Sequence, residues 1–303
     1  MMGTQPAPET HSTNPERRGV KKGLYLIPSA FTAANIGMGF YAIMSALRGF
    51  QFVGTGVEGD LLRAAVYLDY AALAIGAAVV FDMLDGRIAR LTKTTTEIGI
   101  QLDSIADVVT FGLAPAVLVY VWGYGASLEE GSGLHRLAWF LSFMYLMCGA
   151  FRLARFNVQS SRPRVLAEGT VKLDKKSFVG LPIPVAGGLI AAIIHFTPVP
   201  LVYYGPDRAQ IYAILLMVLV GMLSVLMVST LRFTSFKEVG TGSRSMRTII
   251  LAVAFFMLII LYSQYVLLAL ATTYILYGLL SRAVGFFRRR GEVGESTVEA
   301  KQV

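Results

Sequence analysis

The chain has 303 residues, of which 55% are hydrophobic and only 15% are charged. A soluble domain carries about 25% charged residues, so this composition excludes an ordinary soluble protein and indicates a polytopic membrane protein. The net charge of +8 would also suit a nucleic-acid-binding protein. The basic residues lie between apolar segments, however, and this favours membrane topology and lipid head groups over nucleic acid as partners.

Three regions are expected along the chain. Residues 1–22 begin with a polar run rich in Pro, Thr and Ser, which predicts a disordered cytoplasmic tail. Residues 23–287 form the membrane-embedded domain, and residues 288–303 form a basic and then polar C-terminal tail.

Apolar segments of about 20 residues predict an all-α bundle of about eight transmembrane helices. In chain order they lie near residues 27–47, 64–84, 104–123, 136–151, 181–203, 210–230, 247–264 and 266–284. The last two divide one apolar stretch that is too long for a single crossing, and Ser263 and Gln264 supply a polar hairpin tip. Eight spans place both termini on the same side of the membrane.

The basic residues support this topology. All but four of the 27 basic residues fall on the side of the termini, the exceptions being Arg48, Arg63, Arg136 and Arg208. Because cytoplasmic loops carry an excess of Lys and Arg, both termini are predicted to lie in the cytoplasm and the chain in the plasma membrane.

The most informative motif joins the second and third predicted spans. It reads Asp82-x2-Asp85-Gly86-x2-Ala89-Arg90, then eight residues, then Gly99-x3-Asp103-x3-Asp107. Spacings of three and four residues place each pair of aspartates on one face of a helix. The connection is long enough to fold the two helices back antiparallel. All four carboxylates are therefore expected to converge at the cytoplasmic leaflet.

Converging carboxylates need a compensating charge, because bare anions repel one another. Two divalent cations would neutralise them and leave coordination positions for a diphosphate. Arg90 adds a fork-shaped phosphate donor, and Gly86 leaves room for a bulky ligand. The hydroxyls of Thr94 to Thr96 are further donors to phosphate. Asp107 lies deepest in its span and is the best candidate for a general base acting on an alcohol.

Two readings outside this chemistry stay open. Intramembrane acids also mark ion or proton pathways, so an ion transporter is one alternative, although transport gives no reason for the Gly and Arg of the motif. A non-catalytic membrane scaffold is the other. The three histidines, including His195 in an apolar segment, form no cluster and are given no role.

The complete motif resembles that of the CDP-alcohol phosphotransferases. These integral membrane enzymes move a phosphoalcohol group from a CDP-linked donor to an acceptor alcohol and release CMP. The resemblance implies that Asp82, Asp85, Asp103 and Asp107 bind two Mg²⁺ or Mn²⁺ ions, and that Asp107 also serves as the catalytic base.

The resemblance also implies a set of donor-binding residues. It assigns Asp82, Gly86, Arg90 and, more loosely, Thr96 to CDP-diacylglycerol. In the first span, Pro28-Ser29-x2-Thr32-x2-Asn35 is similar to the family's opening motif, from which Ser29 departs. This similarity places Thr32 and Asn35 beside the nucleotide.

Three later segments, 149–157, 177–184 and 227–237, resemble parts of the bacterial and archaeal phosphatidylserine synthases of this family. They imply that L-serine is the acceptor. Arg152, Arg155 and Lys237 are the cations available for its carboxylate, or else charges that only set topology. Glycerol 3-phosphate or an inositol phosphate as acceptor, and an ether-linked donor lipid, remain alternatives. Relatives of this family also suggest a homodimer.

Overall fold

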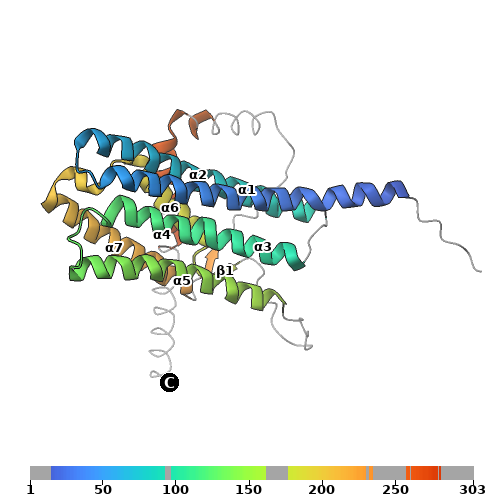
Figure 1. The fold of residues 1–303 in the computed structure, drawn as a ribbon. Coiled ribbons are helices and arrows are strands. Elements are labelled where there is room, and N and C mark those ends of the chain that lie inside the picture. The colour runs from blue at the N-terminus through green and yellow to red at the C-terminus, as the bar shows by residue number, and fades with distance from the viewer. Residues whose placement is uncertain are drawn as a thin grey trace, which may run out of the picture.

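A computed structural model describes residues 15–92, 97–161, 177–229, 232–234, 257–259, 261–278 and 280. The axes of the long helices are roughly aligned, and the helices pack side by side as a bundle (Figure 1). In chain order the elements are α1 (Pro15–Val53), α2 (Glu58–Thr92), α3 (Glu97–Asp107), η1 (Val108–Leu113), α4 (Ala114–Val119), η2 (Tyr120–Tyr124), α5 (Gly133–Ser161), β1 (Ser177–Val179), α6 (Ile183–Phe196), η3 (Leu201–Tyr204), α7 (Pro206–Val228) and β2 (Arg232–Thr234). A further helix covers residues 263–278. The predicted all-α membrane bundle is confirmed.

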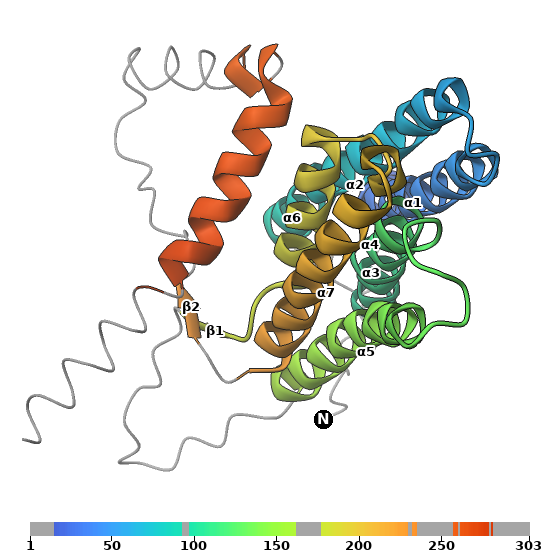
Figure 2. The same cartoon turned by 90° about the vertical axis from the view of Figure 1, so that its left-hand side faces the viewer.

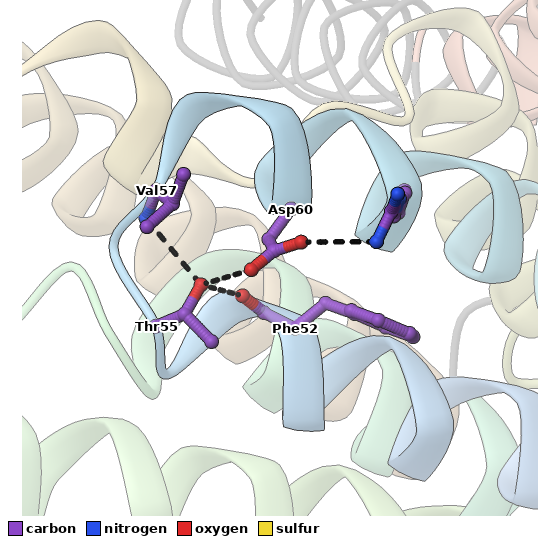
Figure 3. Close-up of polar contacts among 5 residues, drawn as sticks. Phe52, Thr55, Val57 and Asp60 are labelled. Atoms are coloured by element: carbon purple, nitrogen blue, oxygen red, sulfur yellow. Dashed lines mark hydrogen bonds and ion pairs between the residues drawn. The ribbon is translucent and has the colours of Figure 1, made fainter.

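The helices α1 and α2 form an antiparallel pair closed by a short polar turn (Figure 3). The Thr55 hydroxyl lies 2.9 Å from the carbonyl oxygen of Phe52 and 3.0 Å from Oδ2 of Asp60. Asp60 also pairs with Arg63 at 3.5 Å and lies in the first turn of α2, where a negative charge complements the helix dipole. The side chains of Thr55 and Asp60 therefore have hydrogen-bond or ion-pair partners where α1 ends and α2 begins.

The third span is a continuous helix with two π-helical segments, η1 and η2, which the sequence did not predict. Pro115 lies at the start of α4 and has no N–H to donate to the carbonyl of Phe111, four residues before it. The hydroxyl of Tyr145 on α5 donates to that carbonyl instead, at 3.0 Å. A side chain from a neighbouring helix thus supplies the donor that Pro115 lacks.

The helix α6 is shorter than its predicted span of 181–203. It has 14 residues, or about 21 Å at 1.5 Å per residue, against the roughly 30 Å of a bilayer core. Pro198 and Pro200 stop it, because proline cannot continue a helix. The indole of Trp122 then donates to the carbonyls of Thr197 and Val199 at 3.0 and 2.9 Å.

The entry to α6 is held by the end of α7. The strands β1 and β2 pair antiparallel, and the N–H of Leu181 donates to the carbonyl of Leu226 at 3.0 Å. Gly180, which lies between β1 and Leu181, has φ +83°, and a Cβ there would collide with the carbonyl of Met227. This position requires glycine for both its backbone conformation and its close contact.

The count of eight spans stays a prediction. Within the described residues, five helices are long and apolar enough to cross a membrane. The helix of residues 263–278 matches the start of the predicted span 266–284, and Tyr262 forms a bend beside the expected hairpin tip. Most of the span predicted near 247–264 lies outside the described residues. At the other end, α1 begins at Pro15 and so includes residues 15–22 of the predicted tail.

Large apolar side chains cover the outside of the bundle. Trp139, Leu215 and Val218 expose 61%, 61% and 66% of their surface, for example, while the core is filled by small and aliphatic residues. An outer surface of this kind is stable in lipid and not in water. The chain is a membrane protein.

Candidate active site

Three aspartates from two helices meet at one end of the bundle. Asp82 comes from α2, and Asp103 and Asp107 come from α3; one carboxylate oxygen of each lies within 4.8 Å of the others. All three are at least partly buried. The convergence expected from the motif is therefore confirmed for these three residues.

Asp85 occupies a separate position next to this cluster. It is 7% exposed, and its Oδ2 accepts a hydrogen bond from the Thr32 hydroxyl on α1 at 2.6 Å. Its charge still acts on Asp82 and Asp103. Thr32, which the opening motif placed near the nucleotide, thus holds the fourth aspartate in place.

Three buried polar atoms near this end have no hydrogen-bond partner among the described residues. They are Oδ1 of Asp107, Oδ1 of Asn35 and Nε of Arg152. Leaving such an atom unpaired costs about 1–3 kcal/mol. Asp107 and Arg152 interact electrostatically, so unpaired atoms of opposite character lie in one region. This arrangement is suited to a polar ligand that carries both donors and acceptors.

The two predicted arginines on α5 have different surroundings. Arg152 is 8% exposed and interacts electrostatically with Asp107, Arg155 and Tyr274. Arg155 donates from Nη1 to the carbonyl of Val228 at 3.0 Å and therefore caps the end of α7. The site thus has one buried arginine beside the carboxylates and a second that anchors the main chain.

The remaining predicted residues are only partly described. Gly86 is exposed on α2, one turn after Asp82, where a ligand can approach it. Arg90 also lies on α2, but its side chain is outside the described part of the chain, as are Thr96 and Lys237 altogether.

Asn157 is a site residue that the sequence did not single out. Its Nδ2 donates to the Ser104 hydroxyl at 2.8 Å, which ties α5 to α3 immediately beside Asp103. The only signal available was its position at the end of the segment 149–157. A sequence motif does not show that Asn157 and Ser104, which are uncharged and 53 positions apart, contact each other.

The residues of the cluster fit a hard divalent cation. Mg²⁺ and Mn²⁺ prefer carboxylate oxygens, and three such groups converge here with one buried oxygen unpaired. Within the part of the chain that the structure describes, the group consists of carboxylates alone, the ligand type that suits hard cations.

Residues 25–204 match the family model described as CDP-alcohol phosphatidyltransferase. The matched region contains all four aspartates and the helices that carry them. The chain belongs to the CDP-alcohol phosphatidyltransferase family. The resemblance inferred from the aspartate motif is therefore confirmed.

Relatives of this family member come from bacteria, yeast and archaea. A CDP-diacylglycerol–serine O-phosphatidyltransferase of Helicobacter pylori is 31% identical over 257 residues, which cover 85% of this chain and 91% of the relative. Proteins of the same name from Saccharomyces cerevisiae and Methanocaldococcus jannaschii are 35% identical over 158 residues and 41% identical over 113 residues. These cover 52% and 37% of this chain, and 49% and 44% of the relatives.

Proposed function

We propose that this protein transfers the phosphatidyl group of CDP-diacylglycerol to the hydroxyl of L-serine, giving phosphatidylserine and CMP. The observation that carries the proposal is the convergence of Asp82, Asp103 and Asp107 in a chain that is similar along 85% of its length to a CDP-diacylglycerol–serine O-phosphatidyltransferase. The similarity extends beyond the family region and thus includes the segments that resemble phosphatidylserine synthases.

The four aspartates are proposed to hold two Mg²⁺ or Mn²⁺ ions. Bound there, the metal would neutralise the carboxylates and the charge that develops on the phosphate oxygens. The buried Oδ1 of Asp107 and the three-carboxylate geometry support this assignment.

The donor is proposed to enter from the bilayer with its acyl chains in lipid. Asp82, Gly86, Arg90, Thr96, Thr32 and Asn35 are the proposed donor-binding residues. Gly86 allows close approach, Arg90 and Thr96 donate to the diphosphate, and the unpaired Oδ1 of Asn35 accepts from the nucleotide. Thr32 contributes by orienting Asp85.

The serine is proposed to lie between Asp107 and Arg152. Asp107 takes the proton of the serine hydroxyl, whose oxygen attacks the phosphorus that carries diacylglycerol as the bond to CMP breaks. Arg152 is buried and has an unpaired Nε, so it is the better partner for the serine carboxylate. Arg155 already donates to a main-chain carbonyl.

The site is proposed to face the cytoplasm of the plasma membrane, with both termini on that side. This orientation follows from the distribution of Lys and Arg between the spans. A homodimer is proposed by analogy with the family alone.

Purified protein in detergent, supplied with CDP-diacylglycerol and Mn²⁺, is expected to release CMP when serine is added. EDTA should abolish the release, and excess Mn²⁺ should restore it. Glycerol 3-phosphate and an inositol phosphate serve as competing acceptors in parallel assays. CMP release with either of these but not with serine would refute the acceptor, and release unaffected by EDTA would refute the metal.

Arg152→Lys should raise the KM for serine by about tenfold or more while the KM for CDP-diacylglycerol stays near its original value. Lysine keeps the charge but loses the planar fork that matches a carboxylate, and a charged hydrogen bond contributes about 1.5–3 kcal/mol. The matched control is Arg155→Lys, which removes the same group one turn away and should lower thermal stability without this selective change. Equal KM values for serine in both variants would remove Arg152 from the acceptor site.

A further inference from the structure

A hydrogen-bonded chain of three side chains joins three helices away from the aspartate cluster. Nδ1 of His195 on α6 lies 2.5 Å from Oδ1 of Asp69 on α2, and its Nε2 lies 2.8 Å from the hydroxyl of Ser263. A carboxylate accepts hydrogen bonds, so Nδ1 donates to Asp69, and Nε2 shares the second hydrogen bond with the Ser263 hydroxyl.

The contacts among Asp69, His195 and Ser263 lie far from the aspartate cluster. Asp69 and Asp82 lie 13 positions apart on α2, which corresponds to about 20 Å along the helix axis. His195 is only 6% exposed, and both of its ring nitrogens are used in these two contacts. Polar groups in a membrane bundle are costly unless paired, and these three satisfy one another.

The helix of residues 263–278 is exposed along one side. Figure 2 shows it in red-orange at the edge of the bundle, beside α6. Tyr262, Tyr265 and Tyr277 on and beside this helix expose 57%, 63% and 57% of their surface. Near Ser263, the ring of Tyr265 lies edge-on to Phe196, with 5.5 Å between the ring centroids. This ring contact and the polar contact at Ser263 join the start of the helix to α6.

The inner part of the same helix packs on the core of the bundle. Leu268, Ala271 and Tyr274 contact the buried cluster that includes Ile275.

We propose that Asp69, His195 and Ser263 form a polar latch that docks the helix of residues 263–278 against α2 and α6. Ser263 lies beyond residues 25–204, which match the family model, so the latch joins a later helix to the family region.

The latch is tested without any activity measurement. Ser263→Ala and His195→Gln should each lower the thermal unfolding midpoint in detergent, and the double variant should lose less than the sum of the two, because each change breaks the same contact. Ser263→Thr keeps the hydroxyl and should restore stability, while Thr273→Ala on the exposed face should have little effect. Additive losses overturn the latch, whichever acceptor the enzyme uses.

The order Asp, His, Ser also resembles a nucleophilic relay. Covalent labelling of Ser263 by a fluorophosphonate would therefore contradict a purely structural role.

Discussion

Asp107→Asn is expected to lower the rate of serine-dependent CMP release by about 10²–10⁴-fold, the usual contribution of a positioned general base. The amide has nearly the same shape but cannot accept the proton of the serine hydroxyl. Binding of CDP-diacylglycerol, measured by titration with Mn²⁺ present, should weaken far less than turnover, because Asp82, Asp85 and Asp103 remain.

The matched control for this substitution is Asp60→Asn. It makes the same change in the turn between α1 and α2, where Asp60 contacts Thr55 and Arg63 on the opposite end of the bundle (Figure 3). This variant should keep its activity and lose only a little stability, because exposed ion pairs contribute at most about 1 kcal/mol. Near-normal turnover of Asp107→Asn would remove that residue from the role of base, whatever the control shows.

The aspartate cluster was predictable because its information is local. The spacings in the motif fix the helical faces, and the connection is long enough to let the third span return antiparallel to the second. Both facts can be read from neighbouring residues. The convergence of Asp82, Asp103 and Asp107 follows from them without any knowledge of the other helices.

The contacts that support the cluster were not predictable in the same way. His195 was given no role, although it pairs with Asp69 and Ser263, which lie 126 and 68 positions away in the chain. The sequence around a single polar residue in an apolar segment does not indicate which distant residue forms a hydrogen bond with it. Arg155 is another example, because a pattern of charge cannot distinguish a ligand-binding arginine from one that caps α7.

The irregular backbone of the third span could not be predicted either. Tyr145 and Gly187 both lie close to the carbonyl of Phe111, to which Pro115 cannot donate. Apolar periodicity predicts only that residues 104–123 cross the membrane. It carries no information about the π-helical turns of η1 and η2.

Gly39 is expected to be the most sensitive glycine of the first span. A Cβ at this position would lie 2.9 Å from Cα of Thr110 and would overlap the Thr110 hydroxyl, which donates to the carbonyl of Asn35 at 3.0 Å. Thr110 is one turn after Asp107. The close approach of α1 to η1 therefore sets the distance between the first span and the base.

Gly39→Ala should lower the free energy of unfolding by about 1–3 kcal/mol, the cost of overpacking a tight contact, since the backbone of Thr110 cannot move aside. The shift of α1 should also carry Thr32 away from Asp85 and so reduce turnover. Gly37→Ala is the control, because Gly37 is exposed and a Cβ there meets nothing within 4 Å. That variant should be neutral or more stable by up to about 1 kcal/mol, since alanine favours the helix. Thermal unfolding in detergent and CMP release measure both effects, and equal behaviour of the two variants would show that α1 and η1 do not meet at Gly39.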